Sequence, residues 1–310
     1  MVDRRSFVAA SVSLLAGPSW SAVLKLGQAS RTRLILLGTG GGPRPRKNRA
    51  ASSQVIIVNG AAYVVDCGDG VARQLVLAGI PLTTLRHIFI THHHSDHNAD
   101  YGNLILLAWA VGLNTRLDTW GPPPLDRITK LFFEMSATEI NTRIADEGWS
   151  PLVPLVHVHE VTSTGAITND GNVKVTCAVV PHPLIELALA YRFDAPDRSI
   201  VISGDTAPSD NLVQLAKGAD VLVHEAMYLP AVDRLAARRP TARGLKQHLL
   251  ASHTSAQDAG RVAQAAGVKL LVMSHLIPAD DPTITDQMWI DAARVHFRGP
   301  VIVGKDLLEI

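Results

Sequence analysis

Cysteine and excess charge of either sign are both scarce in this chain of 310 residues. The two cysteines, Cys67 and Cys177, lie far apart, so they can supply neither a disulfide framework nor a thiolate zinc site. The formal net charge is only +1, whereas a dedicated nucleic-acid binder usually carries a strongly basic domain. We therefore expect no nucleic acid among the partners. Linkers, low-complexity tracts and visible internal repeats are also missing, which favours a single domain.

The apolar run nearest the amino terminus, residues 8–16, is too short to span a membrane. It follows Arg4 and Arg5, a pattern typical of a signal peptide with a twin-arginine n-region. We therefore predict a signal peptide in residues 1–29 and a folded domain in residues 30–310, without a membrane span. Such a protein would be periplasmic or secreted. An amphipathic tail is the alternative interpretation.

Histidine, in contrast, is abundant: the chain has 13. Residues 91–97 contain the pattern His-x-His-x-Asp-His, which comprises His92, His94, Asp96 and His97. Imidazole nitrogens and carboxylate oxygens are ligands of borderline-soft divalent metals, with zinc first among them. An apolar run at residues 85–90 precedes the pattern and predicts a buried strand. The donors therefore follow a strand end, where open α/β architectures place their sites.

Three further donors each come at or just after a predicted strand, namely His182, Asp205 and His275. With the histidine loop they make a set large enough for two metal ions that share a carboxylate. Two cations about 3.5–4 Å apart need a shared anionic ligand and can hold a water between them as hydroxide. Zinc lowers the pKa of such a water toward about 7, so a nucleophile exists at neutral pH.

Short β-branched runs alternate with helical segments, which is typical of an α/β fold. Asn59 and Gly60 give the strongest hairpin signal in the chain. We expect helices at residues 69–78 and 256–266, and a loop followed by one long outer helix within residues 120–149. The expected strands span residues 34–37, 54–58, 62–65, 85–90, 173–180, 187–193, 199–203, 221–223, 269–273 and 301–303.

Several motifs, taken in order, resemble the metallo-β-lactamase superfamily, in the branch that contains ribonuclease Z and the zinc-dependent arylsulfatases. They are Leu37-Gly38-Thr39-Gly40, Asp66-Cys67-Gly68-Asp69-Gly70, the histidine loop, Ser203-Gly204-Asp205-Thr206, His224-Glu225-Ala226, His253-Thr254-Ser255 and Met273-Ser274-His275. The resemblance implies a four-layer αββα sandwich. It also assigns His92, His94 and His182 to one metal, Asp96, His97 and His275 to the other, and Asp205 to both.

The resemblance implies two divalent ions, with zinc preferred, although the same ligands accept manganese, iron or cobalt. His93 is outside the pattern, and we expect its side chain to point away from the metals. The family resemblance further places His253 near the leaving group as a general acid, oriented by Glu225. The alternative for His253 is an ordinary residue before a helix. Asp96 and Asp205 would hold and orient the hydroxide.

Ribonuclease Z typically carries a long arm between the positions of His182 and Asp205, and here two predicted strands use up that stretch. We therefore expect a small anionic ester as substrate, a sulfate or phosphate ester cleaved in the manner of an arylsulfatase. The alternatives are a ribonuclease Z-like or cyclic-nucleotide phosphodiesterase, a lactonase, and a metal-binding scaffold without catalysis. The basic run from Arg44 to Arg49 is either a receiver of anionic oxygens or a solvated face. The tryptophans either line an aryl pocket or pack in the core, and a homodimer is left open.

Overall fold

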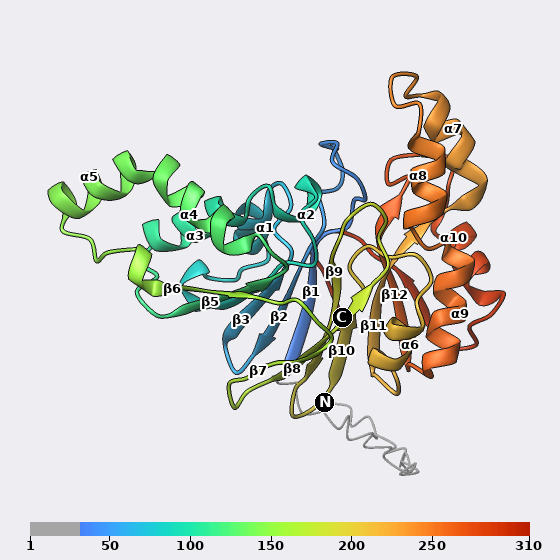
Figure 1. The fold of residues 1–310 in the computed structure, drawn as a ribbon. Coiled ribbons are helices and arrows are strands. Elements are labelled where there is room, and N and C mark those ends of the chain that lie inside the picture. The colour runs from blue at the N-terminus through green and yellow to red at the C-terminus, as the bar shows by residue number, and fades with distance from the viewer. Residues whose placement is uncertain (1–31) are drawn as a thin grey trace, which may run out of the picture. The chain divides into compact units, whose positions relative to one another are not determined.

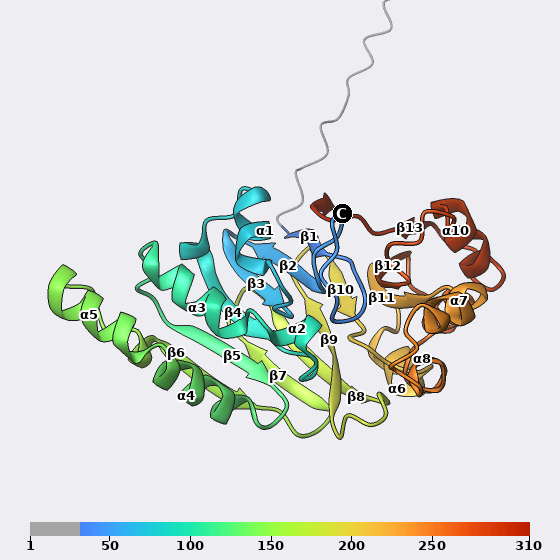
Figure 2. The same cartoon turned by 90° about the horizontal axis from the view of Figure 1, so that it is seen from above.

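The computed structural model describes residues 32–310, and the predicted signal peptide lies outside the described residues. In the described part, two seven-stranded sheets lie face to face and helices cover their outer faces (Figures 1 and 2). The sequence-based prediction of a four-layer αββα sandwich is confirmed. Among these residues no helix is long and apolar enough to cross a membrane.

The first sheet contains all the amino-terminal strands and the last strand of the chain. In spatial order its strands are β14 (Leu308–Glu309), β1 (Thr32–Gly38), β2 (Ser53–Val58), β3 (Ala61–Val65), β4 (Leu85–Phe89), β5 (Leu117–Gly121) and β6 (Val156–Glu160). The β2–β3 hairpin forms because Asn59 and Gly60 both adopt positive φ, at 50° and 81°, which a two-residue hairpin turn requires.

The second sheet contains the strands from the middle and end of the chain. In spatial order they are β13 (Val301–Val303), β12 (Leu270–Ile277), β11 (Val221–Met227), β10 (Ser199–Ile202), β9 (Ala188–Asp194), β8 (Lys174–Val180) and β7 (Gly165–Asn169). Strands β10 to β13 run parallel, whereas β7 to β10 are antiparallel.

The core lies in three layers, because both faces of each sheet are buried. Between the sheets, Phe89 of β4 packs edge-to-face on Tyr191 and Phe193 of β9. The outer face of the first sheet is covered by α1 (Val71–Leu77), α3 (Tyr101–Ala110), α4 (Leu125–Met135) and α5 (Ala137–Glu147). The outer face of the second sheet is covered by α6 (Asp210–Leu215), α9 (Ala256–Ala266) and α10 (Asp286–Arg294).

Three further helices lie at the edge where the strands of both sheets end. They are α2 (Ser95–Asn98), α7 (Val232–Ala237) and α8 (Leu245–Ser252). Helix α9 begins as predicted at Ser255, whose hydroxyl accepts a hydrogen bond from the backbone N–H of Asp258. It ends at Gly267, which adopts a left-handed φ of 65°.

The predicted long helix within residues 120–149 is wrong. That segment begins with the end of β5 and then forms two helices, because the chain leaves helical geometry at Ser136, between α4 and α5. Strands β5, β6 and β7 were also missed. Strand β5 carries Asp118, whose carboxylate accepts hydrogen bonds from Arg116 and His159, so charge interrupts the apolar pattern that signals a strand.

Candidate metal centre and adjoining cavity

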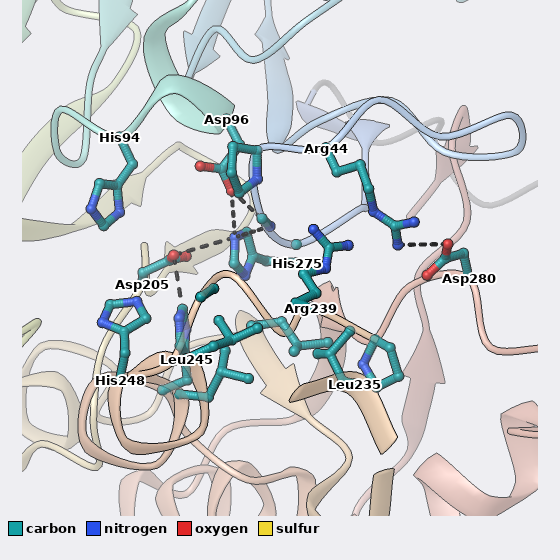
Figure 3. Close-up of a pocket in the computed structure, with 18 of the residues that line it drawn as sticks. Arg44, His94, Asp96, Asp205, Leu235, Arg239, Leu245, His248, His275 and Asp280 are labelled. Carbon is teal, nitrogen blue, oxygen red and sulfur yellow. Dashed lines mark hydrogen bonds and ion pairs between the residues drawn. The ribbon is translucent and has the colours of Figure 1, made fainter. Parts of the chain in front are cut away.

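The seven predicted metal ligands converge at one edge of the sandwich, although they come from four separate segments. The loop after β4 carries His92 and His94, and the short helix α2 carries Asp96 and His97. The other three come from the second sheet: His182 follows β8, Asp205 follows β10, and His275 lies in β12. Figure 3 shows side chains from both groups facing the same cavity.

The first cluster consists of four donors whose ligand atoms lie within 4.8 Å of one another, namely His92, His94, His182 and Asp205. The Nδ1 atom of His94 lies 3.1 Å from Nε2 of His92 and 3.3 Å from Nε2 of His182. Burial lowers the pKa of all three imidazoles, that of His182 to about 4. They are therefore neutral at neutral pH, as metal ligation requires.

The second cluster consists of Asp96, His97 and His275. Nε2 of His275 lies 3.2 Å from a carboxylate oxygen of Asp96 and 3.2 Å from one of Asp205. Nε2 of His97 lies 3.3 Å from the other oxygen of Asp205. Asp205 thus faces ligands of both clusters, which is the position the sequence predicted for a shared carboxylate.

His275 reaches the centre because of a local irregularity, not because β12 ends there. Its φ is 43°, an unusual value for a residue with a side chain, and the pairing register of β11 and β12 shifts beside it. The expectation that His275 comes at a strand end is therefore corrected: the strand continues to Ile277. Such a bulge turns one side chain toward a site without ending the sheet.

Three buried ligand atoms make no hydrogen bond among the described residues: Nδ1 of His275, and the facing pair Nε2 of His97 and Oδ1 of Asp205, which lie 3.3 Å apart. Leaving such atoms unpaired costs about 1–3 kcal/mol each, and more for charged groups. Burial opposes ionisation of Asp205, yet the facing imidazoles His275 and His97 hold its pKa well below the usual range. A cation beside His97 and Asp205 would be bound by the Nε2 and Oδ1 atoms of this facing pair, so the residues present fit a divalent metal.

Neighbouring groups orient several ligand rings. Asp66, at the end of β3, accepts hydrogen bonds from the backbone N–H and the hydroxyl of Thr91, at 2.8 and 2.9 Å. The same carboxylate lies 2.7 Å from Nδ1 of His97, which leaves Nε2 of that ring for the centre. His182 Nδ1 lies 2.9 Å from the carbonyl oxygen of Ser252. These contacts determine which nitrogen of each ring is free. The sequence contained Asp66 within a motif but did not reveal this role.

His93, as predicted, points away from the centre. Its Nε2 atom lies 2.8 Å from the carbonyl oxygen of Pro122, and Asn98 lies 3.0 Å from its Nδ1 atom. The side chain therefore joins the histidine loop to the segment after β5.

The pair His253 and Glu225 lies beside the clusters. Nδ1 of His253 is 3.0 and 3.1 Å from the two oxygens of Glu225, and the His253 ring stacks on that of His275 with centroids 5.7 Å apart. Burial lowers the pKa of His253, but the charge and hydrogen bonds of Glu225 outweigh it and raise the pKa to about 9. The His253 side chain is also buried, which excludes the alternative of an ordinary exposed residue before a helix.

The basic residues from Arg44 to Arg49 make several separate contacts. Arg46 directs its guanidinium to the backbone oxygens of Gly41 and Gly42, and the N–H of Gly42 donates to Asp96 at 2.8 Å. Arg49 binds the carbonyl oxygen of Gly304, and Arg44 pairs with Asp280 at 2.7 Å. The run is thus neither one solvated face nor one anion site.

A cavity of about 370 Å³ adjoins the clusters. His94, Asp96, Asp205, His253 and His275 contribute to one wall (Figure 3). The opposite wall comes from α7, α8 and the turn between them, through Leu235, Arg239, Leu245, His248 and Leu249. Among residues 32–310, no tryptophan lines this cavity and neither do Phe132 and Phe133, and Trp109 packs in the core instead. His248 and Arg239 were missed because neither sits in a motif nor beside a predicted strand.

Comparison with known proteins identifies relatives over most of the chain. Residues 62–276 match the family model described as the β-lactamase superfamily domain. A protein of Mycobacterium bovis named Ribonuclease Z is 32% identical over 280 residues, which cover 89% of this chain and 97% of that relative.

Two solved structures share the fold. The metallo-β-lactamase fold protein YhfI of Bacillus subtilis and human tRNase Z, short form, are each 21% identical, and each match covers 90% of this chain and 98% of the other. The TM-scores are 0.67 and 0.66.

These relatives overturn one expectation about partners. The prediction that nucleic acid is not a partner is wrong, because relatives above 30% identity are named for an action on RNA. The alignment of 280 residues covers 97% of the Mycobacterium bovis relative and 89% of this chain, so the two aligned segments are of nearly equal length. That relative therefore has no long arm in addition to what this chain contains. The missing arm therefore does not separate this chain from that relative, and the preference for an arylsulfatase loses its main support.

Proposed function

Because the chain belongs to the β-lactamase superfamily, in its metallo-β-lactamase ribonuclease Z branch, we propose that this metal-dependent hydrolase cleaves phosphodiester bonds of RNA. The observation that carries the proposal is the complete set of seven facing donors with His253 and Glu225 beside it. The names of the relatives support RNA over a sulfate ester.

We further propose that the centre holds two zinc ions, one at His92, His94 and His182, the other at Asp96, His97 and His275, with Asp205 between them. When bound, such ions polarise a phosphoryl oxygen and lower the pKa of water toward about 7. The N–H of Gly42 holds one oxygen of Asp96 and restricts the rotation of that carboxylate.

In this proposal His253 supplies the proton that the leaving oxygen needs. Its Nδ1 atom is engaged with Glu225, so Nε2 is the atom free to donate. The negative charge of Glu225 keeps the ring protonated at neutral pH, which a general acid requires. Asp205 lies 3.9 Å from the same ring and adds to this effect.

The test is turnover by the purified zinc-loaded chain on four substrates: bis-nitrophenyl phosphate, a single-stranded oligoribonucleotide, nitrophenyl sulfate and a lactone. We expect cleavage of both phosphodiesters, abolished by chelator and restored by zinc. Sulfate hydrolysis without phosphodiester cleavage would support the arylsulfatase instead. If none of the substrates shows chelator-sensitive turnover, the chain is a metal-binding scaffold.

Export through a twin-arginine signal is a separate proposal, supported by Arg4, Arg5 and the apolar run that follows them. The exported protein would be roughly 15–30 residues shorter than the full chain, as measured by intact mass. An exported protein of full length would contradict it.

A further inference from the structure

We propose that an arginine-lined groove beside the metal centre binds the phosphate next to the scissile one in a single-stranded RNA, with Arg239 as the contacting residue. This inference rests on the proposed function, because it extends the phosphodiester substrate by one nucleotide. It assigns a role to the segment between α7 and α8, which contributes no metal ligand.

The groove is a continuation of the active-site cavity. A second cavity, also of about 370 Å³, is lined by Arg238, Pro240 and Thr241. It shares Arg44, Leu235 and Arg239 with the cavity at the metal centre. A ligand bound at the metals can therefore extend past Arg239 without leaving the concave surface.

Arg239 is the arginine of this groove that has no internal partner. Arg44 pairs with Asp280 at 2.7 Å, and Arg238 lies 3.9 Å from Asp281, which also binds Arg234. Within residues 32–310, the guanidinium of Arg239 makes neither a hydrogen bond nor an ion pair, although its backbone N–H donates to the carbonyl oxygen of Ala236, and its side chain is half-buried. A guanidinium in this position is free to form a bidentate pair with a phosphate.

The two ends of the cavity suit different parts of a nucleotide chain. Figure 3 shows Arg44 and Arg239 on one side, and His94 and His248 on the other. Leu235 and Leu245 also line this cavity. Leucine side chains accept a sugar or base without hydrogen-bond readout, and the residues that line the cavity include no Phe, Tyr or Trp. The groove therefore favours contact with the backbone over recognition of base identity.

The size of the cavity favours a single strand. Sites of about 300–1,000 Å³ take ligands of the size of a drug, which is close to that of one nucleotide. A cavity of about 370 Å³ takes one such unit at the metals, and the adjoining one takes the next. A substrate with a single phosphate leaves Arg239 without a partner, so the geometry points to a substrate with at least two.

The experiment measures binding of a short 5′-labelled single-stranded oligoribonucleotide by fluorescence anisotropy, over a series of salt concentrations. The full chain is used with chelator present, so that no cleavage occurs. We expect Arg239→Ala to weaken binding by about tenfold and to reduce the slope of log K against log salt by about 0.7, the value for one phosphate contact on a single strand. Arg239→Lys should recover part of the affinity.

Arg243→Ala is the matched control, because Arg243 is an exposed arginine four residues away that lines neither cavity. It should bind as the unaltered chain does. If the Arg239→Ala variant binds RNA as tightly as the unaltered chain, or if the unaltered chain binds no RNA, the proposed phosphate site at Arg239 is contradicted. Chelator-sensitive cleavage of bis-nitrophenyl phosphate is measured in parallel: if it persists while RNA binding is absent, the groove fails and the phosphodiesterase chemistry stands. If RNA binds but no diester is cleaved, the proposed function fails instead.

Discussion

His253 is held by contacts that a residue with a purely structural role would not need. Glu225 binds its Nδ1 atom with both carboxylate oxygens, and His182 and His275 contact its ring at centroid distances of 5.2 and 5.7 Å. Asp205 lies farther from the same Nδ1 atom, at 3.9 Å, whereas Glu225 is within hydrogen-bond distance of it at 3.0 Å. The ring therefore lies beside the metal donors with Nδ1 engaged, and the side chain lines the cavity at the clusters.

We expect His253→Ala to keep its metal content and to lose about 10²- to 10⁴-fold in kcat, the usual contribution of a positioned general acid. Metal content is measured by elemental analysis and kcat with bis-nitrophenyl phosphate. His93→Ala is the control in the histidine loop and should retain both metal and turnover, because His93 is directed to Pro122. Loss of metal from the His253 variant would make His253 a ligand instead.

At the scale of elements, the metal loop depends on close backbone contact with the turn between β3 and α1. The N–H of Cys67 binds the carbonyl oxygen of His97, and the N–H of Asp100 binds the carbonyl oxygen of Cys67. Gly68 lies against this loop so closely that a Cβ atom there would overlap the backbone oxygen of Asp96 and lie 2.6 Å from Cβ of Ala51. The position of α2 therefore requires glycine at residue 68.

Gly68→Ala should push α2 away and weaken metal binding by about 10- to 100-fold, the range seen when groups that orient ligands are disturbed. The measurement is a zinc titration against a competing chelator. Gly244→Ala is the control, because a Cβ there meets nothing within 4 Å and its φ is −90°. Unchanged zinc affinity in the Gly68 variant would show that the loop can adjust without cost.

At the scale of the whole molecule, the metal centre joins the two sheets. His92, His94, Asp96 and His97 follow strands of the first sheet, whereas His182, Asp205 and His275 belong to the second. Without a cation, the facing atoms of His97 and Asp205 stay buried and make no hydrogen bond. A ligand that binds only the folded state stabilises it by mass action.

Zinc at a thousandfold excess over its Kd should raise the free energy of unfolding by about 4.1 kcal/mol. For a chain of this size that corresponds to a rise in Tm of roughly 6 °C. Thermal unfolding with chelator and after adding zinc back gives the shift. Asp205→Asn should lose most of it, because the shared carboxylate is then absent. A Tm that does not respond to zinc in the unaltered chain would contradict a metal between the sheets.

The sequence by itself predicted the donor residues that the structure brings together and much of the fold, for a local reason. The spacing in residues 91–97 and the positions of Asp205 and His182 just after apolar runs depend only on neighbouring residues and on strand direction. The same local patterns predicted most of the strands and helix α9. Strands β5 and β6 were not predicted, because Asp118, His157 and His159 interrupt their apolar pattern. The contact between Asp118 and His159 joins the two strands and is visible only in the structure.

Only the tertiary structure decided what surrounds the metal ligands. The contact of Asp66 with His97, the free guanidinium of Arg239 and the place of His248 all arise from segments that are distant in sequence. The bulge at His275 likewise depends on how β11 and β12 pair. Packing between remote segments sets the cavity wall and its charge, and no local pattern encodes that packing. The metal chemistry was therefore readable from the sequence, whereas the shape of the substrate site was not.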